Sequence, residues 1–148
     1  MKINITKKEY VKLLDMFYIA DWIMHAFCSE ERVETKEYRD LEQKFFSHAK
    51  EFGVDDLVEK YPSEGEFYPA RKFEDETPAM DFIDEYNEES FWDELIEQLA
   101  RRDMIEKHGL DKMKSIFEDE DIFNELEDLK DKYAREFEEN GIRRLRLS

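Results

Sequence analysis

The sequence has little of what interrupts helices or cross-links a chain. Its 148 residues include 4 glycines, 3 prolines and a single cysteine, Cys28. One cysteine cannot form an internal disulfide, which argues against a disulfide-stabilised secreted scaffold. Because glycine and proline are the poorest helix formers, their scarcity favours helices over other structure. The composition is therefore typical of an all-α protein from a reducing compartment.

Long hydrophobic runs are also absent. The longest unbroken apolar run extends over Met16–Ala20, whereas a membrane-spanning helix needs about 20 such residues. The first ten residues, MKINITKKEY, contain no apolar stretch of the kind that a signal peptide carries. We therefore expect a cytoplasmic protein that does not associate with membranes.

Enough apolar material is present for a core. Hydrophobic residues make up 41% of the chain and aromatic residues 14%, and this length is usual for one domain. We expect residues 1–148 to form a single domain, an all-α bundle of about five helices. Because Pro62, Pro69 and Pro78 lie close together, a long irregular loop is expected at about 61–77.

Capping signals mark the starts of several helices. Thr6 followed by Glu9 has the capping-box pattern, which predicts a helix that runs to about Cys28. Thr77, with a proline after it, and Asn87 are each expected to cap a further helix. The acidic residues that follow Asn87 suit the positive end of a helix dipole.

Both chain ends alternate apolar and polar residues, as strands do. Ile3 and Ile5 share one side of the first segment, and Leu145 and Leu147 share one side of the last. The sequence therefore predicts a small two-stranded β ribbon formed by the two termini over the helices. The arginines of 143–146 would then lie against the acidic part of the chain. A free basic tail is the alternative.

Negative charge dominates, and it is unevenly distributed. There are 40 Asp and Glu against 23 Lys and Arg, a formal net charge of −17. Residues 1–50 contain 9 of each sign, so residues 51–148, with 31 acidic and 14 basic residues, carry the whole excess. Between Phe73 and Leu99 there are 11 acidic residues and no Lys or Arg. Such a surface repels phosphate, so we expect no direct contact with nucleic acid.

This acidic segment suggests a surface for a basic protein partner. The residues expected to form it are Glu74, Asp75, Glu76, Asp81, Asp84, Glu85, Glu88 and Glu89. Under this hypothesis the protein is a small non-enzymatic interaction or regulatory module, and in one form it masks a nucleic-acid-binding protein by imitating phosphate charge. The alternative is a solvated face that keeps the protein soluble.

Polar side chains also fall on helix faces that are otherwise apolar. At about 100° per residue, Asp21 and His25 lie among the apolar residues of the first helix, and their spacing of four lets them meet. On the second helix, Glu42 falls on the apolar side and His48 at its edge. Asp15 falls on the side that faces water.

These inward residues have two interpretations. In the structural one, Asp21 accepts a hydrogen bond from His25 and Glu42 finds a partner such as Tyr18, since a buried carboxylate is costly unless it is paired. In the functional one, Asp21, His25, Glu42 and His48 form a binding, metal or acid–base site inside the bundle.

No motif of a known enzyme class is present, neither a nucleotide-binding loop nor a nucleophile elbow. We therefore expect a non-enzymatic protein without a cofactor. The alternative is a metal-binding or catalytic bundle that holds one divalent metal. A third hypothesis is a homodimer formed through an unused apolar edge of the bundle.

Overall fold

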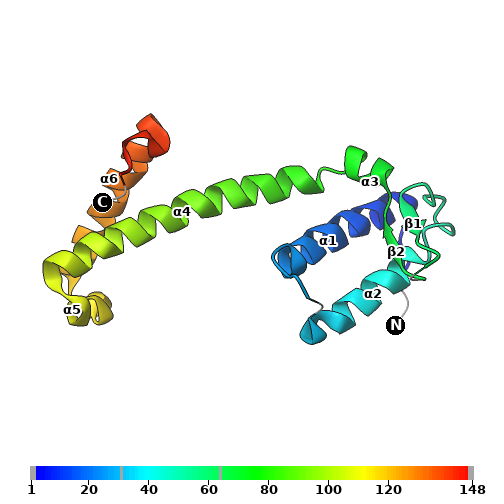
Figure 1. Ribbon diagram of the computed structural model, residues 1–148, viewed down its shortest axis with the longest axis horizontal. Coiled ribbons are helices and arrows are strands. Elements are labelled where there is room, and N and C mark those ends of the chain that lie inside the picture. Colours follow the sequence, from blue (N-terminus) through cyan, green and yellow to red (C-terminus); the bar gives the residue numbers. More distant parts are fainter. Residues whose placement is uncertain (1–2, 31, 64, 147–148) are drawn as a thin grey trace. The chain divides into compact units, whose positions relative to one another are not determined.

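The computed structural model describes residues 3–30, 32–63 and 65–146 (Figure 1). These residues form six α-helices, three short 3-10 helices and one two-stranded antiparallel sheet. The predicted mainly helical fold is thus confirmed. No helix among the described residues is both long enough and apolar enough to cross a membrane.

Contacts within the chain divide it into two compact units, residues 1–84 and 85–148. We call them the N-terminal unit and the C-terminal unit. The single domain expected for residues 1–148 stays a prediction.

The N-terminal unit begins with the predicted capping box. The Thr6 side chain accepts a hydrogen bond from the backbone N–H of Glu9, and the Glu9 carboxylate accepts one from the backbone N–H of Thr6 at 2.7 Å. Helix α1 (Lys7–His25) follows. It ends before the expected Cys28, where the Arg32 guanidinium donates to the carbonyl of Met24 at 3.3 Å. A cation at the last carbonyls suits the negative end of the helix dipole.

The N-terminal unit has one apolar core. The remaining elements of this unit are η1 (Val33–Thr35), α2 (Lys36–Phe46), β1 (Val58–Lys60), β2 (Phe67–Pro69), α3 (Arg71–Glu76) and the first turns of α4 (Ala79–His108). The buried core residues are Tyr10, Leu14, Phe46, Ala49, Val54, Leu57, Val58 and Phe73. The ring of Tyr10 stacks on that of Phe52, with centroids 4.1 Å apart.

The β ribbon is formed by central strands, so the prediction of a ribbon between the two termini is wrong. Strands β1 and β2 pair antiparallel with Val58 opposite Pro69. Ile3 is 71% exposed, the segment 141–144 forms the 3-10 helix η3 (Gly141–Arg144), and Leu147 lies outside the described residues. The segment 61–77, expected to be an irregular loop, contains β2 and α3.

The side chain of Gln43 ties the central strand β2 to α2. Its amide donates to the carbonyl of Phe67 at 2.7 Å and accepts from the N–H of the same residue at 2.7 Å. This pair of bonds holds β2 against α2 and satisfies two backbone groups of an edge strand.

Helix α4 is one continuous helix, so the break predicted at Asn87 is wrong. Asn87 is exposed within it. Asparagine is only a weak helix breaker, and the residues around it are good helix formers. The predicted start is confirmed in part, because the hydroxyl of Thr77 accepts the backbone N–H of Ala79 at 3.1 Å.

The C-terminal unit packs the later part of α4 against α5 (Leu110–Lys114), η2 (Ile116–Glu118) and α6 (Glu120–Asn140). Its buried core residues are Ala100, Met104, Met113, Ile116, Ile122 and Leu126. Near the end of α6, the ring of Phe137 lies against Trp92 with centroids 5.5 Å apart. In the arginine-rich segment, Arg144 forms an ion pair with Glu136 at 3.1 Å.

Candidate functional site

Three of the predicted inward residues line one cavity of about 190 Å³ in the N-terminal unit, which we call the polar cavity. Asp21 and His25 reach it from α1, and Glu42 reaches it from α2. The complete lining consists of Tyr18, Asp21, His25, Arg39, Glu42, Gln43, Phe46, Phe67, Tyr68, Pro69 and Glu74. The fourth predicted residue, His48, does not line it and instead pairs with Glu51 at 3.1 Å.

Asp21 and His25 form the hydrogen bond expected from their spacing. The Nδ1 atom of His25 lies 2.7 Å from Oδ1 of Asp21, and Nε2 lies 2.8 Å from the hydroxyl of Thr35. Thr35 is buried, and its hydroxyl also donates to the carbonyl of Arg32 at 2.9 Å. This chain of bonds ties the end of α1 to the start of α2.

The order carboxylate, imidazole, hydroxyl is that of a catalytic triad, but the surroundings differ. A nucleophilic hydroxyl must give its proton to the imidazole and face the substrate. The Thr35 proton is engaged by a backbone carbonyl, and Thr35 is not among the residues that line the cavity. The geometry thus fits a positioning role for these residues.

Glu42 is the unusual group in the polar cavity. Among the described residues nothing donates a hydrogen bond to its carboxylate, so the expected bond to Tyr18 is not made. Burial, together with the charges of Asp21 and Glu66, raises its pKa to about 7 against the opposing effect of Arg39. Desolvation and nearby like charge both favour the protonated form of a carboxyl.

The positive group of the cavity is already engaged. Arg39 donates to the carboxylate of Glu66 at 3.1 Å and to the hydroxyl of Tyr68 at 3.4 Å. Tyr68 in turn donates to Glu66 at 3.0 Å. The positive charge of Arg39 therefore neutralises mainly the charge of Glu66, and it neutralises that of Glu42 only in part.

The alternative of a metal site gains no support from this arrangement. Within 3–30, 32–63 and 65–146, no three His, Cys, Asp or Glu side chains converge in a way that could hold a metal ion. Asp21, His25 and Glu42 share a cavity without meeting at one point.

All eight carboxylates of the predicted interaction surface are exposed. Five of them belong to the N-terminal unit and three to the C-terminal unit. Asp75 lies 3.8 Å from Arg71 and Glu76 lies 3.9 Å from Lys72, near the limit for an ion pair. None of the other six, Glu74, Asp81, Asp84, Glu85, Glu88 and Glu89, forms an ion pair with any residue that the structure describes.

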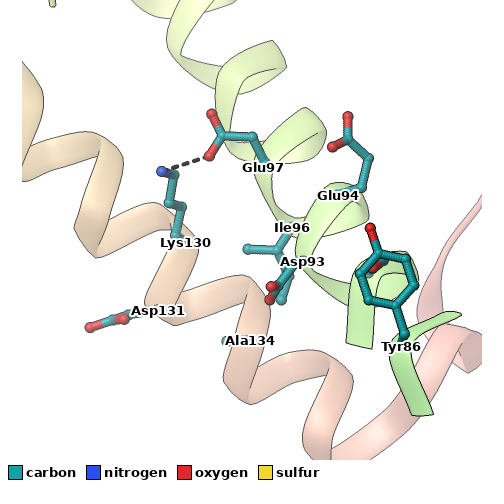
Figure 2. Close-up of a pocket in the computed structure, with 9 residues that line it drawn as sticks. Tyr86, Asp93, Glu94, Ile96, Glu97, Lys130, Asp131 and Ala134 are labelled. Atoms are coloured by element: carbon teal, nitrogen blue, oxygen red, sulfur yellow. Dashed lines mark ion pairs between the residues drawn. The ribbon is translucent and has the colours of Figure 1, made fainter. Parts of the chain in front are cut away.

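An acidic groove of about 640 Å³ adjoins this surface in the C-terminal unit, between α4 and α6 (Figure 2). Its carboxylates are those of Asp93, Glu94, Glu97 and Asp131. The one cation among the residues that line it is Lys130, which pairs with Glu97 at 2.6 Å and lowers the pKa of that carboxyl. Asp93 and Asp131 have no ion-pair partner in the described part of the chain, so the groove keeps a negative excess.

Sequence reasoning missed the groove because its two walls are more than 30 residues apart in the chain. It also placed Asp15 on the water side. The structure buries this carboxylate, which accepts hydrogen bonds from Thr77 at 2.7 Å and from Lys12 at 2.8 Å. The partner Thr77 lies 62 residues later, and no signal near Asp15 reveals it.

Comparison of the chain with protein-family models, with curated proteins and with solved structures found no match. The function is therefore inferred from the residues and their arrangement alone.

Proposed function

We propose that the protein is a non-enzymatic interaction module that binds a basic protein partner through the acidic face of α4 in the C-terminal unit. We define this face by Glu85, Glu88, Glu89 and Asp93. The observation that carries the proposal is that these four exposed carboxylates have no ion-pair partner among the described residues. Some exposed acids elsewhere, such as Asp56 and Asp111, do pair with lysines.

The helix geometry makes two of these carboxylates, Glu89 and Asp93, continuous with the acidic groove. At about 100° per residue, Glu89 and Asp93 fall within about 60° of Tyr86, which lines the groove. Tyr86 is 60% exposed. An exposed aromatic ring beside unpaired carboxylates suits a partner segment with Lys or Arg next to apolar side chains.

A charge pattern of this kind affects the rate of association with a partner more than it affects the packing of the interface. Opposite charges on a partner steer the encounter and raise the association rate, and salt screens this effect. The binding proposed here therefore weakens as ionic strength rises.

The test is capture of partners from the native lysate by the full chain, with elution in steps of increasing salt. The variant Glu85→Gln/Glu88→Gln/Glu89→Gln removes three charges from the acidic face. A matched control, Asp128→Asn/Glu138→Gln/Glu139→Gln, removes three charges from α6 in the same unit that are exposed and form no ion pair with any described residue. We expect a basic protein that moderate salt releases, with binding weakened about tenfold by the first variant only.

Two results would contradict the proposal. One is capture that is insensitive to salt. The other is equal loss of the partner with both variants, since that would reflect net charge rather than this face.

A further inference from the structure

Helix α1 carries a second row of apolar side chains, on the side that does not face the core. Its core side includes the buried residues Tyr10 and Leu14. The second row, which we call the outer stripe, consists of Leu13, Met16, Ala20, Ile23 and Phe27, the last in the turn directly after the helix. At about 100° per residue, these five positions fall within an arc of about 80°. Their alternating spacing of three and four residues is that of the contact positions of a coiled coil.

The outer stripe is open to solvent. Met16 is 64% exposed, Ile23 is 55% exposed and Phe27 is 96% exposed. Ala20 is also exposed, and Leu13 is half-buried. At about 200 Å² for a whole side chain of this size, the exposed parts of the three large side chains amount to roughly 400 Å² per copy. A continuous apolar row of this size is typical of an interaction surface, whereas single exposed apolar residues are not.

The charges around the outer stripe favour a second copy of this chain as its occupant. The acidic residues between Leu13 and Phe27 are Asp15 and Asp21. Asp15 is buried and Asp21 lines the polar cavity, so neither lies on the arc of the stripe. Two chains with a net charge of −17 repel each other, and they approach most easily where the charges balance. Residues 1–50, which include the stripe, contain 9 charges of each sign.

The outer stripe is complementary to itself when two copies run antiparallel. Leu13 and Phe27 each lie seven residues from Ala20, so a two-fold axis at Ala20 places Leu13 of one copy opposite Phe27 of the other. The same axis places Met16 near Ile23. The small side chain of Ala20 lets the two helices approach closely where they cross. The contact is then isologous, as in most homodimers.

The two ends of the outer stripe also carry opposite charges. Lys8 precedes the stripe and Glu30 follows it. Both are exposed, and neither forms an ion pair with any residue that the structure describes. In an antiparallel pair, Lys8 of one copy lies at the end that carries Glu30 of the other, and the helix dipoles also oppose each other. A parallel pair would instead bring like charges together.

We propose that the outer stripe of α1 is the interface of a weak homodimer, in which two α1 helices cross antiparallel on a two-fold axis at Ala20. Both copies together bury on the order of 1,000 Å², which is at the low end for a specific interface. We therefore expect a dissociation constant in the micromolar range. The interface uses a different surface from the acidic face of α4 and does not depend on it.

The test is sedimentation equilibrium of the full chain over a range of concentrations and salt. We expect a monomer–dimer equilibrium that shifts toward the dimer as salt rises, because salt screens the repulsion between two acidic chains. Binding of a basic partner has the opposite dependence on salt.

The variant Ala20→Glu places two carboxylates opposite each other on the two-fold axis. It should raise the dissociation constant at least about tenfold. Asn124→Glu adds the same charge at an exposed site of α6 and should have little effect. In the same way, Phe27→Ser should weaken the dimer about tenfold, whereas Phe117→Ser removes an aromatic ring that is 87% exposed in η2 and should not. Circular dichroism checks that each variant is folded.

Charge reversal tests the antiparallel arrangement. Lys8→Glu should weaken the dimer about threefold, and adding Glu30→Lys should restore it. Failure of the second change to restore the dimer would overturn the antiparallel arrangement.

Three results would overturn the homodimer. One is a chain that stays monomeric at about 1 mM. Another is association that Asn124→Glu weakens as much as Ala20→Glu does. The third is a monomeric chain that captures a different protein and loses it in Ala20→Glu, since the outer stripe would then belong to that partner.

Discussion

At the residue scale, the polar side chains divide by whether they have partners. Asp15 is buried and accepts two hydrogen bonds, as a buried carboxylate must. Glu42 is half-buried and accepts none among the described residues. The carboxylate of Asp15 therefore costs the folded state little free energy. The ionised carboxylate of Glu42 lowers the stability of the folded state.

The cost of Glu42 should depend on pH. Its folded pKa, about 7, lies above the ordinary value of 4.5, so the folded state holds the proton more tightly than the unfolded state. The contribution of Glu42 to stability is then fully present below pH 4.5 and is lost as pH rises through 7. The groups that face Glu42 are Tyr18, Asp21, His25, Arg39, Glu66, Tyr68 and Glu74.

We therefore expect Glu42→Gln to stabilise the protein at pH 8 but not at pH 4.5. The gain should be on the order of 1–2 kcal/mol, less than the full pKa shift implies because solvent screens the partly exposed carboxylate. Urea unfolding at both pH values measures it, with Glu37→Gln as the control. An equal effect at both pH values would show that Glu42 does not carry the pH dependence.

The contact between Asp21 and His25 could be predicted from the sequence, because two residues four apart on a helix are neighbours in any fold. The lack of a hydrogen-bond donor to Glu42 among the described residues could not be predicted from the sequence. It depends on where Arg39 and Glu66 pair, and Glu66 comes directly before strand β2.

At the element scale, the start of α4 connects the helix to the core. The hydroxyl of Thr77 accepts the backbone N–H of Ala79 and donates to the buried Asp15. One side chain thus caps a helix and satisfies a buried carboxylate.

Replacing Thr77 tests this double role. Thr77→Val keeps the shape but loses both bonds, so we expect a loss of about 2–3 kcal/mol in the free energy of unfolding. Thr77→Ser keeps the hydroxyl and should cost less than about 1 kcal/mol. Chemical denaturation of both variants gives the comparison. A cost for Thr77→Val no larger than that for Thr77→Ser would contradict the double role of the hydroxyl.

Local signals predicted the elements whose causes are local. The capping box at Thr6 begins a helix where the sequence places it. The β ribbon was misplaced because the termini alternate apolar and polar residues, whereas the strands that form it are three residues each and do not alternate. These strands are supported by their pairing and by the tertiary bonds of Gln43 to Phe67.

At the scale of the whole molecule, charge is the dominant property. A net charge of −17 produces self-repulsion that salt screens. The ion pairs are mostly exposed, and exposed pairs contribute little. Added salt should therefore increase stability, because it screens the repulsion between like charges more than it weakens the ion pairs.

We expect the melting temperature at pH 7.5 to rise by several degrees between about 10 mM and 500 mM sodium chloride. Thermal unfolding followed by circular dichroism measures it. A fall over the same range would mean that the exposed ion pairs stabilise the fold more than its net charge destabilises it. Light scattering of the same samples tests the homodimer, which stays a prediction.

The most direct test of the interaction module is a hydrogen-exchange footprint of the complex with the captured basic partner. If the acidic face of α4 is the binding surface, backbone amides at 85–97 and at 130–134 should exchange more slowly in the complex, whereas α2 should not change. Protection confined to other segments, with 85–97 unaffected, would contradict the assignment of this face.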